Sequence, residues 1–402
     1  GDLPRATEFL RESIDLMRQL VESDPGNTTW QRSLSLPLDA LSDVTKVQRD
    51  LTEATQLANE SLDIARRLTE SDPNNRQWQH DLALSLERLG ELAKIQGNVP
   101  EAARYFSEEV DVLRPLAEAS RDHIDWQRDM ARALNRAGDL SLLLGNLPEA
   151  QRVYRESLDI RTTLAASAAP HPRRHRDLVN SYWKLGKVAM AADDFTESAA
   201  HFKSAVDALE RLSEDDHEVQ YAKSWLPSAR RRHRAAETAP IAIGDWDVLV
   251  AQPADELPAL LQLRCSQLAR RGQTADVEQA AAKLLELAAT DGTANEQKAG
   301  LLYNAACGYG LCAMLTSGWD GHSLFTTKSE PDNSEPDSSG PELTVDQQSA
   351  RDQYVSQAIS ALKAAVASGW SNLEHMGQDA DLAGLREHPD YKALLTGNAA
   401  TD

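Results

Sequence analysis

A repeat of 48 residues constrains the fold of this chain more than any other feature of its sequence. The segment "ESDPGNTTWQRSL" at 22–34 returns as "ESDPNNRQWQHDL" at 70–82, and the spacing continues from Trp30 and Trp78 to Trp126. Two further columns in the same register carry aspartate and glycine: Asp15, Asp63, Asp111, Asp159 and Asp207, and Gly90, Gly138 and Gly186. An internal period of about 20–50 residues indicates a solenoid, in which each unit buries its apolar face against its neighbours.

Within one unit the apolar residues follow a helical period. In the second full unit they stand at Leu82, Leu86, Leu89 and Ala93, and then at Ala102, Phe106, Val110 and Leu113. The segment 96–98 breaks the pattern, and Pro100 stands where the first turn of a helix tolerates proline. Asn27 and Asn75 follow Asp-Pro pairs and are placed to cap the next helix. We therefore predict two antiparallel helices of roughly 20 residues in each unit, helix A and then helix B.

The order of small and large residues in these units resembles the tetratricopeptide repeat. The segments 86–106, 134–154 and 182–202 carry a glycine on helix A and an aromatic residue on helix B, whereas 38–58 has Ser42 and Ala58 there. The small residue lets the two helices approach, and the aromatic ring fills the gap between units. The usual unit has about 34 residues; the longer unit looks like a bacterial variety often attached to signalling domains. The resemblance implies an all-α fold, a right-handed α–α superhelix of the tetratricopeptide solenoid type.

The repeat also predicts how the chain is divided. We expect long repeats over 1–239, shorter tetratricopeptide-like helices over 246–315, a flexible Ser/Pro/Asp-rich insert over 316–345, and a final helix with a capping tail over 346–398. Within the second of these ranges, the segment 255–290 is expected to form a helix, a turn at Gly272 and a second helix. The segment 238–246 is the expected boundary after the long repeats. Residue 1 enters the register at the start of a helix B, which leaves a lone capping helix or a piece of a longer protein; we favour the second interpretation.

In tetratricopeptide superhelices the concave wall is lined by helix A positions, and the resemblance carries this role onto the present chain. The positions are Arg88 and Glu91, then Arg132, Asn135, Arg136 and Asp139, then Asn180, Trp183, Lys184 and Lys187. The candidate peptide-binding groove consists of Arg88, Arg132, Asn135, Arg136, Asn180, Trp183, Lys184 and Lys187. Its cations and amides could bind an acidic or C-terminal carboxylate through charge-assisted hydrogen bonds, and the tryptophan offers a flat apolar contact. The alternative is a solvated charged groove without a dedicated ligand.

Other parts of the sequence argue against several classes of function. A formal net charge of -21 disfavours nucleic acid or an anionic membrane as the main partner. Three cysteines are too few for a disulfide framework, and they fit a reducing, cytoplasmic setting. The sequence shows no kinase signature motifs, and "GYG" at 308–310 follows no predicted strand. We expect no catalytic residues, no cofactor and no metal site, including at His171 and His175 of "HPRRH".

These observations lead to two hypotheses for function. The first is a non-catalytic scaffold that binds a peptide or a partner helix in the concave groove of the superhelix. The second is the C-terminal regulatory or substrate-recruiting region of a bacterial serine/threonine kinase whose catalytic domain lies upstream of residue 1. A basic run, "ARRRHR" at 229–234, is expected to pair with the acidic segment 209–218 or to dock an acidic partner. The sequence leaves the oligomeric state open.

Overall fold

The computed structural model describes residues 3–167, 172–213, 218–290, 292–319 and 343–396. Within these ranges the regular secondary structure is helical and contains no strand. The chain divides into two compact units, residues 1–230 and 231–402, and each is described by itself. Residues 320–342, which form most of the insert expected at 316–345, lie outside the described residues.

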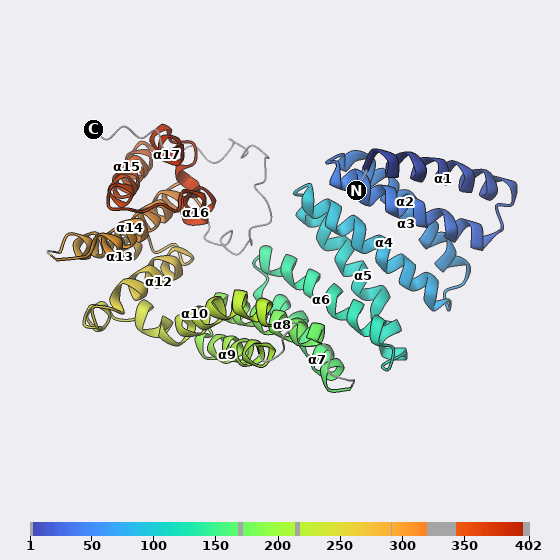
Figure 1. The fold of residues 1–402 in the computed structure, drawn as a ribbon, viewed down its shortest axis with the longest axis horizontal. Helices are drawn as coiled ribbons and strands as arrows, with labels where there is room; N and C mark the ends of the chain where they lie inside the picture. The colour runs from blue at the N-terminus through green and yellow to red at the C-terminus, as the bar shows by residue number, and fades with distance from the viewer. Residues whose placement is uncertain (1–2, 168–171, 214–217, 291, 320–342, 397–402) are drawn as a thin grey trace. The chain divides into compact units, whose positions relative to one another are not determined.

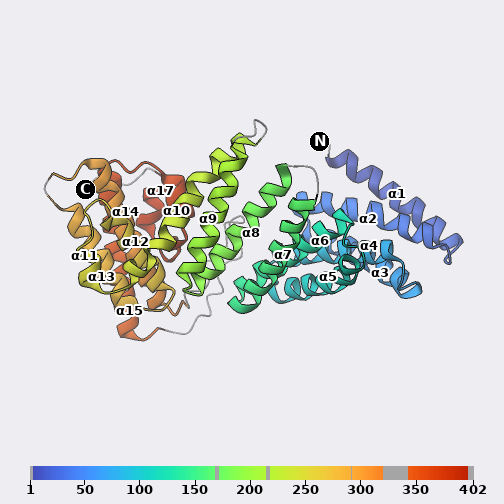
Figure 2. The same ribbon diagram turned by 90° about the horizontal axis from the view of Figure 1, so that it is seen from below.

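Unit 1 consists of α1 and four helix pairs, and α10 follows them and crosses the division between the units (Figure 1). The helices are α1 (Leu3–Ser23), α2 (Thr28–Val47), α3 (Leu51–Ser71), α4 (Arg76–Ile95), α5 (Val99–Ala119), α6 (Ile124–Leu143), α7 (Leu147–Ser167), α8 (Pro172–Ala191), α9 (Phe195–Leu212) and α10 (Val219–Ile243). Each helix from α1 to α8 contacts the next one along the chain. The even-numbered helices α2 to α8 are the predicted A helices and the odd-numbered ones the B helices, and the two rows can be followed in Figure 2. The predicted all-α repeat superhelix is confirmed.

The glycine column explains how helix A and helix B of one pair come close together. A Cβ atom added to Gly90 would lie less than 3.0 Å from the Phe106 ring. The same holds for Gly138 against Tyr154, so a glycine on helix A faces an aromatic ring on helix B. Rings and apolar side chains of this kind fill the interior at the density of an organic crystal, which leaves no room for a methyl group.

The first pair achieves the same packing with other residues. Ser42 and Ala58 take the places of the glycine and the ring, and each is only 1% exposed. The small Ala58 side chain leaves room for the serine, whose hydroxyl donates a hydrogen bond of 2.9 Å to the carbonyl of Ala54. In the unit that matches the repeat pattern least, the smaller residue on helix B therefore compensates for the larger residue on helix A.

Side-chain caps set the start of the A helices, as predicted. Asn27 accepts a hydrogen bond from the backbone N–H of Trp30, and Asn75 accepts one from the N–H of Trp78. In the third unit His123 replaces the asparagine and accepts from the N–H of Trp126 through its ring nitrogen. The three tryptophans thus occupy equivalent, half-buried positions in the first turn of their helices.

Ion pairs between successive B helices repeat with a constant offset of 42 residues. They join Arg11 to Glu53, Arg18 to Glu60, Arg66 to Glu108, Arg114 to Glu156 and Arg155 to Glu197. Exposed pairs of this kind are worth only about 0.2–1 kcal/mol each. Their regular spacing fixes the stagger of neighbouring units more than it adds to stability.

Helix α1 differs from the other B helices in the exposure of its apolar side chains. Phe9 is 58% exposed and Leu16 56% exposed, whereas Leu57 and Ile64, one repeat later on α3, are buried. A preceding helix A covers this face in the later units, and none precedes α1 among the described residues. The prediction that the chain enters the register on a helix B is confirmed.

Unit 2 packs helices of uneven length around one hydrophobic core. After α10 come α11 (Trp246–Val250), α12 (Leu257–Ala269), α13 (Thr274–Ala288), α14 (Asn295–Thr316), α15 (Val345–Ala367), α16 (Leu373–Gln378), η2 (Ala380–Leu385) and α17 (Pro389–Leu395). The predicted helix–turn–helix around Gly272 is present as α12 and α13, and Gly272 has a positive φ of 68°. Helix α14 packs against α12, α13, α15 and η2, and it is the central helix of the unit.

The end of the long repeats differs from the expectation. The segment 238–246 was expected to be a boundary, but α10 continues to Ile243. Pro240 does not end the helix, and Ala239 and Ala242 are both fully buried. Burial of this alanine face extends the helix past the residues that marked a break in the sequence.

Candidate functional site

Four register positions on each A helix form one stripe, because they are three, four and seven residues apart. We call the stripes of α2, α4, α6 and α8 together the helix-A face. Its members are Leu36, Asp39, Ala40 and Asp43; Leu84, Glu87, Arg88 and Glu91; Arg132, Asn135, Arg136 and Asp139; and Asn180, Trp183, Lys184 and Lys187. All eight predicted groove residues belong to it. Ion pairs join each stripe to the next, so the four stripes lie on the same side of unit 1.

The charge of the helix-A face changes sign from α2 to α8. Helix α2 contributes two aspartates and no base, and α4 contributes two glutamates and one arginine. Helix α6 contributes two arginines and one aspartate, and α8 contributes two lysines and no acid. The face is therefore neutral as a whole but acidic at one end and basic at the other.

The acidic end is tied to α4 by Arg88. Its guanidinium lies 3.1 Å from Asp39 and 3.2 Å from Asp43, and its side chain is only 18% exposed. Burial acts to raise the pKa of Asp43, but Lys46 and Arg88 outweigh it and the pKa lies below its usual value. Arg88 is thus held within the chain by two carboxylates.

The middle of the helix-A face contains a buried ion pair. Arg136 pairs with Glu109 of α5, which is 1% exposed, and lies 2.8 Å from Glu87. Burial raises the pKa of Glu109 to about 7, against the opposing charge of Arg136. Removing one partner of such a pair would leave an uncompensated buried charge.

The basic end is held by Lys184, which pairs with Asp139. Tyr154, the ring that covers Gly138, donates a hydrogen bond of 2.5 Å to the same carboxylate. Burial raises the pKa of the Tyr154 hydroxyl, so this group remains a proton donor. The aromatic residue of the repeat and the charged face are therefore coupled through Asp139.

The other predicted groove residues differ in how far they are accessible. Arg132 is 46% exposed although it contacts Glu87, and Asn180 is exposed. Asn135 is 5% exposed, and neither polar atom of its amide has a hydrogen-bond partner among the residues that the structure describes. Trp183 is half-buried, with its ring edge-on to Phe202 at a centroid distance of 5.6 Å. Lys187 is half-buried.

The helix-A face therefore brings the eight predicted residues together, but it also contains residues that the sequence analysis did not assign. Leu36 is 63% exposed and Leu84 is 37% exposed, at the positions that correspond to Arg132 and Asn180. The acidic residues of α2 also lie in this register. Repeated subtraction of 48 from the groove positions would have identified both groups.

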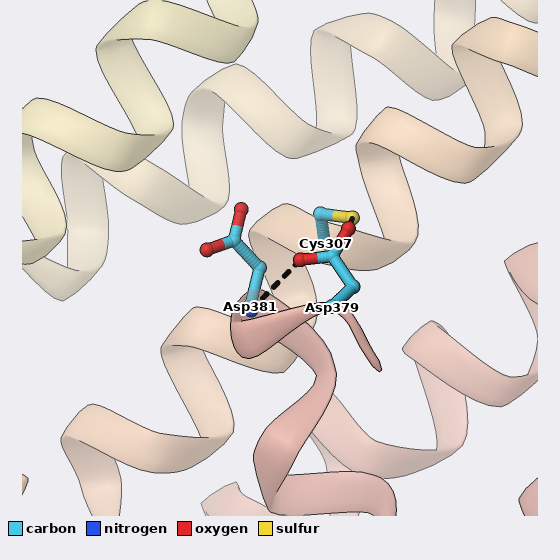
Figure 3. Close-up of side chains that lie close together, drawn as sticks. All are labelled: Cys307, Asp379 and Asp381. Carbon is cyan, nitrogen blue, oxygen red and sulfur yellow. Dashed lines mark hydrogen bonds between the residues drawn. The ribbon is translucent and has the colours of Figure 1, made fainter. Parts of the chain in front are cut away.

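In unit 2, one group of potential metal ligands gathers among the described residues. It consists of Cys307, Asp379 and Asp381, whose ligand atoms lie within 4.8 Å of one another (Figure 3). One oxygen of Asp379 accepts a hydrogen bond of 3.0 Å from the N–H of Asp381, and the other accepts from Tyr303 at 2.7 Å. Burial raises the pKa of the Cys307 thiol well above its usual value, so it stays protonated, whereas metals bind the thiolate. The group anchors η2 to α14 by hydrogen bonds.

The glycines of "GYG" at 308–310 have a packing role on α14. A Cβ at Gly308 would meet the methyl group of Ala281 on α13 at 2.8 Å, and one at Gly310 would meet the backbone oxygen of Asp381 in η2. Both glycines allow close approach of neighbouring backbones. Close packing at these two positions explains the glycines of the motif, and no phosphate ligand is needed to explain them.

The basic run at 229–234 makes ion pairs within each unit. Arg230 lies 2.8 Å from Glu210, which confirms the predicted pairing with the acidic segment 209–218 for this residue. Arg234 lies 3.2 Å from Glu256. Docking of an acidic partner on this run stays a prediction.

None of the described helices combines the length and the apolar character that crossing a bilayer requires. No protein-family model matches the chain, and no curated protein matches it. Several solved structures are similar to it. One is BtubC (BKLC) from P. vanneervenii, with 17% identity over 59% of this chain and 93% of that one, at a TM-score of 0.40.

Two further structures cover more of the chain. The TPR domain of P58(IPK) has 12% identity over 94% of this chain and 100% of that one, at a TM-score of 0.26. Naa15/Naa10 bound to HypK-THB has 12% identity over 96% of this chain and 68% of that one, at a TM-score of 0.19. At such values the fold assignment rests on the helix pairs and the glycine–ring contacts of the chain itself.

Proposed function

We propose that this chain is a non-catalytic scaffold that holds a peptide or a partner helix along the helix-A face. The observation that carries the proposal is the change of charge along that face, from two acids on α2 to two lysines on α8. Complementary charge orients a partner and raises its rate of association. A partner with a basic end over α2 and an acidic end over α8 fits this arrangement.

Exposed leucines support an apolar component of the contact. Leu36 and Leu84 stand in the same register position, on adjacent A helices, at 63% and 37% exposure. Apolar anchors commonly supply most of the free energy of an interface, and surrounding charges set its register. We infer that the basic half of the partner is also amphipathic, with its apolar side chains on the two leucines.

The basic end offers groups that suit a carboxylate. Arg132 is 46% exposed and Asn180 is exposed, so both can contact a partner without any rearrangement of the core. Arg88, Arg136 and Lys184 are between 14% and 18% exposed and already bind carboxylates of the chain. An acidic partner side chain therefore meets Arg132 and Asn180 first.

A pair of matched double variants tests the proposal. Asp43→Lys with Asn180→Glu changes the summed charge of the α2 stripe from −2 to 0 and that of the α8 stripe from +2 to +1, which weakens the change of charge along the helix-A face. Asp63→Lys with Asn59→Glu makes the same change of charge at exposed positions of α3, outside the face. The purified full chain captures partners from native lysate, and quantitative mass spectrometry measures their recovery.

We expect the face variant to lose at least about tenfold of the recovered partner, which corresponds to about 1.4 kcal/mol. We expect the control variant to retain it, and the circular dichroism of both to match the unsubstituted chain. Equal recovery with both variants would show that the helix-A face does not hold the partner.

A further inference from the structure

One column of the repeat departs from its pattern in a single unit. On the B helices this column reads Met17, Ala65, Leu113, Arg161 and Leu209. Ala65, Leu113 and Leu209 are at most 3% exposed, and Arg161 is buried as well, at 6%. A packing position that is apolar in the other units therefore contains a charged group in the fourth.

The guanidinium of Arg161 is poorly satisfied for a buried cation. Its Nη1 donates a hydrogen bond of 2.7 Å to the backbone carbonyl of Asp177. Among the described residues no carboxylate forms an ion pair with it. Burial lowers the pKa of this side chain. Because a guanidinium has five N–H donors, and a buried charge is costly unless it is paired, Arg161 has donors left for a further group.

An ion pair that two earlier units form is not formed beside Arg161 in the described residues. In two earlier units a basic residue on one helix A pairs with an aspartate 49 residues later on the next: Arg32 with Asp81 at 2.5 Å, and His80 with Asp129 at 2.8 Å. The next pair in this series would be Arg128 with Asp177. In the described part of the chain this pair is not formed, and Arg128 instead lies 3.4 Å from Asp125 on its own helix.

A pocket of about 260 Å³ opens between α6, α7 and α8. Its lining consists of Arg128, Ala131, Arg132, Arg161 and Asp177. Three guanidinium groups thus surround it against one carboxylate, in a chain whose formal net charge is -21. Arg132 also contacts Glu87 and Asp129, and Arg128 contacts Asp125, so Arg161 is the one lining arginine without an ion pair among the described residues.

We propose that this pocket binds a phosphate group, with Arg161 as the buried donor and Arg128 and Arg132 at the rim. A phosphate carries a charge of about −1.5 to −2 near neutral pH and several strong acceptor oxygens, which suit the remaining N–H donors of Arg161 better than a single carboxylate does. The planar fork of arginine binds two phosphate oxygens at once. The site shares Arg132 with the helix-A face, but its buried donor, Arg161, lies outside that face on α7.

The phosphate group could belong to a small molecule or to a phosphorylated side chain of another protein. Both present the same oxygens to the pocket, and inorganic phosphate and a phosphoserine peptide serve as probes of the two sources. The unphosphorylated peptide and acetate, at equal ionic strength, are the reference ligands.

Isothermal titration of the full chain tests the proposal with three variants. Arg161→Leu restores the residue that the same column carries in two other units, so this variant should fold. Asp177→Asn removes the one carboxylate of the pocket with little change of shape. Arg104→Leu removes an arginine that is 54% exposed on α5, away from the pocket, and is the matched control.

We expect saturable binding of a phosphate probe, at least tenfold weaker with Arg161→Leu, several-fold tighter with Asp177→Asn and unchanged with Arg104→Leu. A tighter complex with inorganic phosphate would assign the pocket to a small molecule, and a tighter complex with the phosphopeptide would assign it to a protein. Absence of binding, or an affinity that responds equally to Arg161→Leu and Arg104→Leu, would overturn the proposal. Should Arg161→Leu fail to fold, an unchanged affinity with Asp177→Asn would overturn it as well.

Discussion

The contact between Gly90 and the ring of Phe106 allows a quantitative prediction about the repeat. A Cβ at position 90 would lie less than 3.0 Å from the ring, which is fully buried and has no room to move. Overpacking of this kind costs about 1–3 kcal/mol. Alanine also gains about 1 kcal/mol over glycine inside a helix. We therefore expect Gly90→Ala to be neutral or to destabilise α4 and α5 by up to about 2 kcal/mol.

The sign of this effect should reverse when the ring is removed. Phe106→Ala alone should cost about 3–5 kcal/mol. In that background nothing opposes the methyl group, so Gly90→Ala should stabilise the pair by about 1 kcal/mol. The first unit of the chain already has such a combination, in Ser42 and Ala58. The double-mutant cycle should thus give a coupling of about 1–3 kcal/mol.

Hydrogen exchange of the amides in α4 and α5 measures the free energy of local opening, which suits a repeat protein. Gly300→Ala is the matched control, because no atom lies within 4 Å of a Cβ at that helical glycine. It should show only the gain in helix propensity. An effect of Gly90→Ala that is the same with and without the ring would refute the packing argument.

Three further predictions concern caps and buried charges. Asn75→Ala should lower the free energy of local opening at the start of α4 by about 1 kcal/mol, which hydrogen exchange measures. Asn74→Ala removes no cap and should leave this free energy unchanged. Arg136→Met should lower the free energy of unfolding by about 3–5 kcal/mol, and adding Glu109→Met should recover most of the loss in denaturant titrations. Burial and the charge of Asp379 raise the pKa of Asp381 to about 7, so the folded state keeps a proton that the unfolded state releases near pH 4. Stability should therefore fall as the pH rises from about 4 to 7, and a melting-temperature profile of Asp381→Asn should be flatter; an equally steep profile would contradict this.

Much of unit 1 could be predicted because its signals are local and repeated. The glycine column, the Asp-Pro joints and the caps Asn27 and Asn75 each depend on a few neighbouring residues, and the same register returns four times. The same register indicates which residues belong to the helix-A face. The acidic end on α2 is not among the predicted groove residues, because Asp39 and Asp43 are not cations or amides that suit a carboxylate ligand, although both stand at equivalent repeat positions.

The pairing of charges could not be predicted from the sequence. Offsets of 42, 45 and 49 residues separate the partners of the observed ion pairs, and these values depend on the stagger between neighbouring helices. Without that stagger, Arg88 and Lys184 counted as free cations, although carboxylates of the chain hold both. Arg161 is visible as a polar residue in an apolar column, but its burial follows only from the structure.

Unit 2 was less predictable because its contacts join residues far apart in the chain. The contact of Asp379 with Tyr303 spans 76 residues, with no repeat to indicate it. The helix pair around Gly272 was found, since its signals are local. The end of α10 was missed, because burial of the alanines near Pro240 outweighs the local signal for a break.

Site-specific photo-crosslinking tests the partner-binding role of the helix-A face most directly. A benzophenone side chain replaces Leu84 or Asn180 on that face, or Asp63 or Asp111 at exposed positions of the B helices. After irradiation in native lysate, we expect a discrete crosslinked partner from the two helix-A positions and none from the two B-helix positions. Crosslinks that are absent from the helix-A positions, or equally strong from both rows, would contradict a partner held along this face.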